Sequence, residues 1–222
     1  MGGMAFHAAE FMAVALTARD RAAEARRLDA SSMPPDALVS IVMAAAATEA
    51  FINELGAYYR LGTFLQPAEL ACGEVLAEVE RGQGSTQLKY LLASLTLSGH
   101  MFDKGSKPFQ DFSKLMTVRN SLMHPKPLDQ FSDSGVMEPP GFMGDFEQRG
   151  MTYQRDADMS VSWLNLLETE TMASWACGAA VDIILAVINI ASAAAIAPDM
   201  SPMAALGEAF SNHYRPWVHQ QI

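Results

Sequence analysis

The chain has 222 residues, of which half are hydrophobic, and a formal net charge of −10 at pH 7. This length fits one domain spanning 1–222, and the hydrophobic content supplies a sizeable core and argues against disorder. The negative charge argues against a general nucleic-acid binder, a class of protein that is usually basic. Alanine dominates the apolar residues and runs of Val, Ile and Thr are few, so the composition predicts an all-α fold.

Four helices are expected in the first hundred residues. They are separated by a Pro-containing connector at 31–35, by a Gly- and Pro-containing stretch at 62–67, and by a turn at 81–85. Ser85 can cap the fourth helix, because a serine side chain accepts a hydrogen bond from the backbone at a helix start. The expected helices cover residues 4–29, 36–59, 68–80 and 86–97.

The second expected helix carries two polar residues beside its apolar face. Glu49 lies four residues after Ala45 and three before Ile52, and Asn53 follows one turn later. A carboxylate on an apolar face requires a cation, because an unpaired buried charge is costly, and Arg119 is the candidate. The alternative is that Glu49 lies at the edge of the apolar face and reaches water.

A fifth helix is expected over residues 107–123. Ser106 can cap it, and Pro108 falls in its first turn, where the missing N–H costs little. Pro125 ends it, because a proline pushes its predecessor, His124, out of helical geometry.

One face of this fifth helix is apolar and also carries an arginine. Arg119 is seven residues after Phe112, which is about two helical turns, so it projects from the same face. A buried arginine must find a partner or an anion. The apolar face consists of Phe109, Phe112, Met116 and Met123.

Basic residues concentrate around the same helix. The window 104–126 contains five basic residues and one acid, a net charge of +4, so the remainder of the chain carries −14. A local positive patch on an acidic body suits a small anion or a short stretch of phosphate backbone, for which Lys107, Lys114 and Lys126 are the candidate contacts. The alternative is a solvated helix face.

Residues 125–160 show no sustained periodicity and are rich in proline and glycine. A loop of this length inside a compact domain is usually functional or disordered. Its position directly after His124 makes it a candidate lid, and an insertion without a role is the alternative. Within it, residues 141–154 are expected to form a small hairpin.

A long apolar helix is expected after about residue 160. Its segment Ala173–Ala197 has Asp182 as its only charge and is long enough to span a membrane. Because the segment is mostly alanine and lacks a basic flank that would set its orientation, we expect a buried helix in a bundle and no membrane span. A short helix over 201–212 and a tail follow, as a C-terminal extension over 198–222.

Cys72 and Cys177 are far apart and match no metal or redox spacing, which is typical of buried thiols in a reducing compartment. The five histidines show no metal-ligand spacing either. The N-terminus lacks the basic and apolar regions of a signal peptide. We therefore expect a cytoplasmic protein that uses no metal and no cofactor.

Arg119 and His124 together can cleave RNA without a metal. The histidine can remove the proton from the ribose 2′-hydroxyl or protonate the leaving oxygen. The arginine can hold the phosphate and stabilise the charge that builds on it in the transition state. Asn120, one turn before His124, can orient the imidazole or donate a further hydrogen bond. One copy lacks a second proton-transfer group, which a symmetric homodimer would supply.

The motif Arg119-Asn120-x3-His124, late on a helix of an all-α chain, resembles the motif of the HEPN superfamily, in which four to six residues separate an arginine from a histidine. The upstream helix with Glu49 and Asn53 and the long apolar helix also resemble HEPN-like helices, over about residues 36–195. The resemblance implies a bundle of four to five main helices. Short extra helices, an N-terminal helix over 1–30 and the long loop at 125–160 would be additions to it.

The resemblance further implies a homodimer whose motifs face each other and a metal-independent endoribonuclease, often a toxin or an antiviral or stress effector with a neutralising partner protein. Arg119 and His124 would be its catalytic pair, supported by Asn120, Glu49 and Asn53. Some members carry a tyrosine two residues after the histidine that a partner nucleotidyltransferase modifies. Here that residue is lysine, which puts this mode of neutralisation in doubt.

Two functions from different classes therefore compete. The first is an RNA-cleaving enzyme with a composite site across the homodimer. The second is a non-catalytic HEPN-like module that binds a nucleotide or a protein, in which Arg119 and Glu49 form a structural ion pair and His124 only ends a helix. A solvent-filled cleft that Arg119 and His124 line beside a two-fold mate favours the first function, and burial of both residues in the core favours the second.

Overall fold

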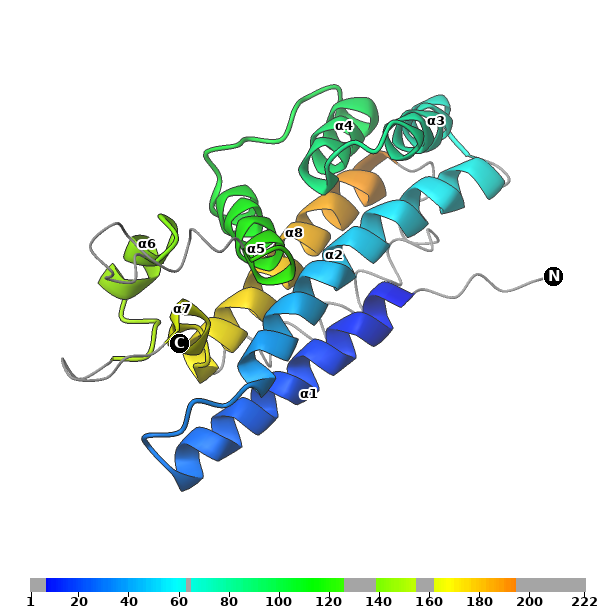
Figure 1. Ribbon diagram of the computed structural model, residues 1–222. Helices are drawn as coiled ribbons and strands as arrows, with labels where there is room; N and C mark the ends of the chain where they lie inside the picture. Colours follow the sequence, from blue (N-terminus) through cyan, green and yellow to red (C-terminus); the bar gives the residue numbers. More distant parts are fainter. Residues whose placement is uncertain (1–6, 63–64, 126–138, 155–161, 195–222) are drawn as a thin grey trace. The chain divides into compact units, whose positions relative to one another are not determined.

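The computed structural model describes residues 7–62, 65–125, 139–154 and 162–194. All regular secondary structure in these ranges is α-helical (Figure 1), which confirms the predicted all-α class. The predicted helix over 201–212 and the tail after it lie outside the described residues. The eight helices in the described ranges are α1 (His7–Leu28), α2 (Asp36–Leu61), α3 (Pro67–Arg81), α4 (Thr86–Ser98), α5 (Lys107–Met123), α6 (Met143–Gln148), α7 (Trp163–Leu166) and α8 (Glu170–Ala194).

The ends of α3 and α4 follow from local sequence signals. Gln66 and Glu69 form a capping box at the start of α3, in which the Gln66 backbone N–H donates to Glu69 Oε2 at 2.7 Å. Ser85 caps α4 as predicted, and its hydroxyl oxygen accepts a hydrogen bond from the Leu88 backbone N–H at 3.2 Å. Gly99 ends α4 with a φ of 76°, a left-handed conformation that favours glycine.

The described residues group into two compact units. The first unit contains residues 7–10, 46–62, 65–113 and 178–194, and the second contains residues 11–45, 114–125, 139–154 and 162–177. Helices α1, α2, α5 and α8 each contribute one part to each unit. Because α5 passes from the first unit to the second after Ser113, the Arg-Asn-His motif belongs to the second unit.

Tyr90 of α4 is a central residue of the first unit's core. Its fully buried ring packs against Phe51 of α2 and Phe112 of α5, with ring centroids 6.5 and 4.6 Å away. Its hydroxyl donates to the carbonyl oxygen of Thr48 at 2.9 Å, which satisfies the buried phenol, and burial holds the pKa of Tyr90 well above its ordinary value. In the same unit α3 and α4 lie side by side (Figure 1).

Small side chains pack the helices of the second unit together. Ala22 of α1, Ala37 of α2 and Ala173 of α8 form one fully buried cluster. Ser40 of α2 and Cys177 of α8 are also in contact, with Oγ and Sγ 3.4 Å apart. The alanines that favour helices in this sequence therefore also permit these helices to approach one another closely.

Residues 141–154 do not form the predicted hairpin, because residues 143–148 form α6. Phe142 packs edge-on against Trp163 with centroids 6.0 Å apart, and Phe146 packs edge-on against Trp175 at 4.7 Å. The prediction was wrong because the two phenylalanines are four residues apart, a spacing that brings side chains together on a helix and not on a strand.

In the described part of the chain, two helices are long and apolar enough to cross a membrane, α2 and the Glu170–Ala193 part of α8. Half of the most apolar window of α2 and 67% of that of α8 are buried inside the structure. Helices in the core of a large globular fold have the same length and composition. Of these two helices, the sequence pattern alone indicates only the second as long enough to span a membrane.

Candidate functional site

The helix that carries the Arg-Asn-His motif, α5, begins and ends where the sequence predicts. At its start, the carbonyl oxygen of Ser106 accepts a hydrogen bond from the Gln110 backbone N–H at 3.0 Å. At its end, the backbone N–H of His124 donates to the carbonyl oxygen of Asn120 at 3.0 Å, and Pro125 has no N–H with which to continue the helix. The motif therefore occupies the end of α5.

The apolar face of α5 is buried over most of its length but not at its end. Phe109, Phe112 and Met116 are buried as predicted, whereas Met123 is 52% exposed. The prediction was wrong for Met123 because periodicity assigns a residue to a side of the helix, not to the part of that side which neighbouring elements cover. Arg119, on the same side, is half-buried.

The motif side chains lie at the surface of the protein. Asn120 and His124 are exposed and Arg119 is half-buried. Nη1 of Arg119 donates to Oδ1 of Asn120 at 3.0 Å. Because a guanidinium has five N–H donors in a planar fork, this bond occupies a single donor and helps to orient the plane of the group.

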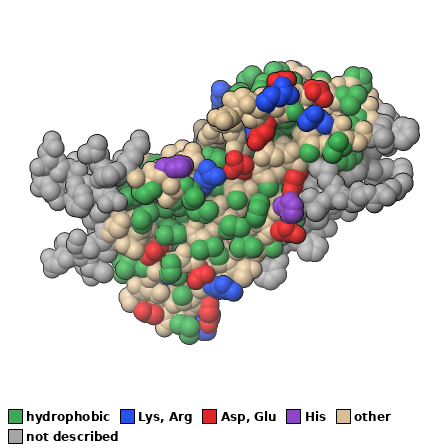
Figure 2. All heavy atoms as spheres, turned by 45° about the vertical axis from the view of Figure 1, so that its right-hand side comes forward, with side chains coloured by type: hydrophobic (Ala, Val, Ile, Leu, Met, Phe, Trp, Pro, Cys, Tyr) green, Lys and Arg blue, Asp and Glu red, His purple; other side chains and the backbone are tan. Residues whose placement is uncertain are grey.

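Two of the predicted phosphate contacts, Lys107 and Lys114, form ion pairs. Lys107 Nζ lies 2.8 Å from Asp111 Oδ2, one turn further along α5. Lys114 pairs with Asp145 of α6, and its ammonium holds the pKa of the Asp145 carboxyl below its ordinary value. Lys126 lies outside the described residues. On the face shown in Figure 2, Lys and Arg side chains lie beside Asp and Glu side chains and do not form one positive patch.

The predicted supporting residues Glu49 and Asn53 belong to the first unit. Glu49 is half-buried, and its ion pair with Arg119 stays a prediction. Asn53 contacts a different cation, because its Oδ1 accepts a hydrogen bond from Lys89 Nζ at 2.7 Å. Lys89 also pairs with Glu80 of α3.

Lys89 is a candidate functional residue that sequence reasoning missed. It is 3% exposed, whereas lysine is almost never fully buried unless it is paired. Helical spacing was the signal that could have found it. Lys89 is three residues after Thr86 and four before Ala93, and all three side chains are buried on the same side of α4.

Among the described residues, no three His, Cys, Asp or Glu side chains gather as ligands of a metal ion would. Cys72 and Cys177 are both buried free thiols, as the sequence predicts. Burial raises the pKa of each thiol to about 11. Thiols with such a high pKa are poor nucleophiles, so neither cysteine is a candidate catalytic group.

A scan against protein-family models, a search of curated proteins and a search of solved structures each found no match to this chain. The resemblance to the HEPN superfamily therefore rests on the Arg119-Asn120-x3-His124 motif and on the helices named with it.

Proposed function

We propose that this protein is a HEPN-like, metal-independent endoribonuclease that acts as a homodimer through Arg119, Asn120 and His124. The observation that carries the proposal is the solvent access of these three side chains at the end of α5. An arginine that only pairs within the core would be covered from solvent. Groups that act on a phosphodiester require access to solvent.

His124 is the proton-transfer group of the proposed reaction. Its imidazole takes the proton from the ribose 2′-hydroxyl, and the 2′-oxygen then attacks the adjacent phosphorus. The bond from phosphorus to the 5′-oxygen breaks, and this oxygen takes a proton from a second acid. The products are a 2′,3′-cyclic phosphate and a 5′-hydroxyl.

Arg119 binds the phosphate that is cleaved. Its N–H groups donate to the non-bridging oxygens, on which charge builds in the transition state. Asn120 is a positioning residue for Arg119, because its side-chain Oδ1 accepts a hydrogen bond from Arg119 Nη1 at 3.0 Å.

A second copy of the chain supplies the second proton-transfer group. Two-fold symmetry places identical groups opposite one another, so one His124 serves as base and the other as acid. The composite site thus requires the dimer.

Lys114 assists RNA binding by exchanging its partner. In its ion pair with Asp145 the two side chains are 41% and 45% exposed, and an ion pair this exposed contributes only about 0–1 kcal/mol, so an RNA phosphate can replace the carboxylate as the counter-ion. Lys107 is 76% exposed but its partner Asp111 is only 10% exposed, so Lys107 keeps this carboxylate and offers an RNA phosphate its remaining N–H donors.

Cleavage of single-stranded RNA in the presence of EDTA tests the proposed mechanism. The wild-type protein is expected to release fragments with 5′-hydroxyl ends. His124→Ala and Arg119→Ala should each lower the rate by roughly 100-fold or more with an unchanged circular dichroism spectrum. His100→Ala and Arg81→Ala are matched controls, because both residues are exposed and outside the motif. Unchanged cleavage by either motif variant would contradict the proposed mechanism.

Dilution tests the composite site. The specific activity should fall together with the fraction of dimer, which light scattering measures on the same samples. A monomeric sample that keeps the full specific activity would contradict a site built from two copies.

The ion pairs of Lys107 and Lys114 favour a second candidate, a non-catalytic helical module that binds a nucleotide or a partner protein. These pairs already neutralise two cations that an RNA-binding surface would use. Nucleotide binding that is lost in Arg119→Gln, without any RNA cleavage by the wild-type protein, would favour this module over the enzyme.

A further inference from the structure

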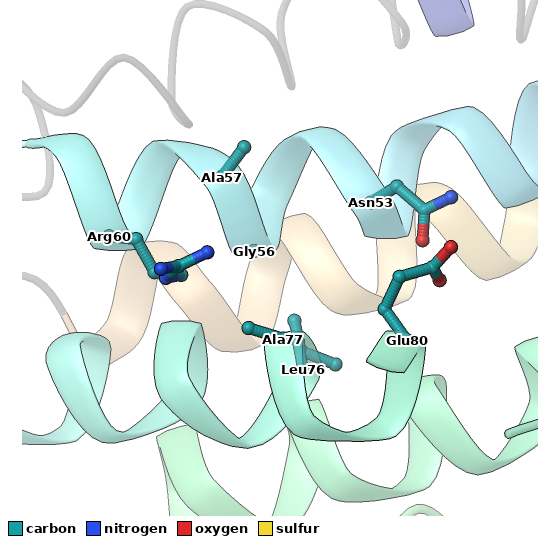
Figure 3. Close-up of a pocket in the computed structure, with 7 residues that line it drawn as sticks. All are labelled: Asn53, Gly56, Ala57, Arg60, Leu76, Ala77 and Glu80. Atoms are coloured by element: carbon teal, nitrogen blue, oxygen red, sulfur yellow. The ribbon is translucent and has the colours of Figure 1, made fainter. Parts of the chain in front are cut away.

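A groove in the first unit runs between α2 and α3 (Figure 3). The two helices are antiparallel along it, since Asn53 is opposite Glu80 at one end and Arg60 is opposite Gly73 at the other. The cavity has a volume of about 190 Å³, about six times the volume of a water molecule in the liquid. It is lined by Asn53, Gly56, Ala57 and Arg60 of α2 and by Leu76, Ala77 and Glu80 of α3.

Two glycines allow α2 and α3 to approach each other closely along the groove. A Cβ atom on Gly73 would lie 3.0 Å from the backbone nitrogen of Arg60, and a Cβ atom on Gly56 would lie 3.0 Å from Cβ of Leu76. Neither position leaves room for a methyl group unless a neighbour moves. This packing holds the backbone of Arg60 in place at one end of the groove.

A buried lysine contacts the two residues at the opposite end of the groove. Lys89 is 3% exposed, its Nζ donates to Asn53 Oδ1 at 2.7 Å, and it pairs with Glu80. The buried ammonium requires these partners, because an uncompensated buried charge is costly, so both side chains are held at this end. The lysine and the glutamate together are neutral. The lone pairs of the glutamate that the lysine does not use can accept a hydrogen bond from a hydroxyl or an amide.

Arg60 provides the positive end of the groove. Figure 3 shows its guanidinium directed along the groove toward Ala77. Its Nε lies 3.6 Å from Glu74 Oε1, and the two side chains are 50% and 69% exposed. An exposed ion pair of this length contributes little, whereas a ligand carboxylate can form two parallel hydrogen bonds with a guanidinium.

We propose that this groove binds a small linear carboxylate with a hydroxyl or an amide at its other end. Asn53 and Arg60 are seven residues apart on α2, about 10 Å along the helix axis, and the Arg60 guanidinium extends along part of this distance, so a chain of about six carbons is the longest that fits. Gly56, Ala57 and Ala77 offer an apolar surface to its methylene groups. A ligand ammonium is disfavoured at the Asn53 end, because it would lie beside the ammonium of Lys89. The groove contains none of the motif residues, so this proposal is independent of the ribonuclease function.

Titration of the full chain with 6-hydroxyhexanoate, followed through backbone amide chemical shifts, tests the proposal. Saturable shifts are expected at Gly56, Ala57 and Ala77, with a Kd in the millimolar range. Arg60→Gln should raise the Kd about tenfold, and 1,6-hexanediol, which lacks the carboxylate, should bind at least that much more weakly. Arg81→Gln is the matched control, since Arg81 is an exposed arginine of α3 outside the groove, and it should leave the Kd unchanged.

A variant that fills the groove provides a second test. Ala77→Leu should also raise the Kd about tenfold, because the larger side chain occupies the space of the methylene groups. A circular dichroism spectrum verifies that the variant is folded, and the Arg60→Gln titration decides the question if it is not. The proposal is overturned if the wild-type protein shows no saturable shifts, if the shifts map away from the groove, or if Arg60→Gln binds the carboxylate as well as the wild-type protein does.

Discussion

The two compact units of this chain hold comparable cations in opposite ways. Lys89 of the first unit is almost fully buried, and Asn53 and Glu80 hold its ammonium in place. Arg119 of the second unit is half-buried at the end of a helix, next to the exposed Asn120. A buried cation cannot exchange its partners without a large cost, so it stabilises the structure and can form part of a cavity wall. An accessible cation can exchange a partner for a substrate phosphate.

Removal of the counter-ion of Lys89 should cause the largest loss of stability. Glu80→Ala leaves the buried ammonium with Asn53 and should lower the free energy of unfolding by about 3 kcal/mol. Lys89→Met removes the charge itself and should lower the free energy of unfolding by about 1 kcal/mol or less. Urea denaturation measures both values. Glu78→Ala is the matched control, because Glu78 belongs to an exposed ion pair of the same helix. A greater loss for Lys89→Met than for Glu80→Ala would contradict this account.

The two cysteines report separately on the opening of the two units. Burial raises the pKa of Cys72 in the first unit and of Cys177 in the second to about 11. At pH 8 the thiolate fraction of each is therefore about a hundredfold below that of an ordinary thiol. Labelling with a disulfide reagent should be at least about a hundredfold slower in the native protein than in urea.

The single variants Cys72→Ala and Cys177→Ala resolve the labelling rates of the two thiols, and different rates would show that the units open independently. Rapid labelling of both native thiols would disprove their burial.

The stability of Arg119→Ala distinguishes an accessible cation from a structural one. If Arg119 binds a substrate phosphate, the free energy of unfolding of this variant should fall by about 1 kcal/mol or less, as is usual for a change near the surface. If Arg119 and Glu49 form a structural ion pair, the loss should be about 3–5 kcal/mol. Urea denaturation decides between the two values, with Arg81→Ala as the control for loss of an exposed arginine.

Removal of the ion pair between Lys114 and Asp145 should cause the smallest loss of stability. Asp145→Asn is expected to lower the free energy of unfolding at pH 7 by at most about 1 kcal/mol, because both side chains are partly exposed. Lys114 lowers the pKa of Asp145 in the folded protein, so the contribution of this pair is present above the ordinary aspartate pKa. It is lost as the pH falls through that value toward the lowered one.

The difference between the wild-type protein and Asp145→Asn should therefore shrink when the urea denaturation is repeated at about pH 3.5. Glu147→Gln, an exposed carboxylate on the same helix, is the control for a general effect of negative charge. A difference between the wild-type protein and Asp145→Asn that persists at the lower pH would show that the ion pair is not its cause.

The sequence by itself determined where most of the helices lie. Ser85 and Pro125 are local signals, because a cap and a proline act on backbone groups within one turn of themselves. The helices α4 and α5 accordingly begin and end as predicted. The motif at the end of α5 was also visible in the sequence, since it depends only on spacing within one helix.

Only the tertiary structure decided which side chains are covered. Met123 follows the apolar periodicity of α5 but is exposed, and Lys89 is polar but buried. Asn53, a predicted supporting residue of the motif, holds the buried lysine. The groove between α2 and α3 likewise depends on two glycines that are distant in the sequence from the residues they contact. The physical reason is that a helical period sets the direction of a side chain about its own axis, whereas burial depends on which other element packs against that direction.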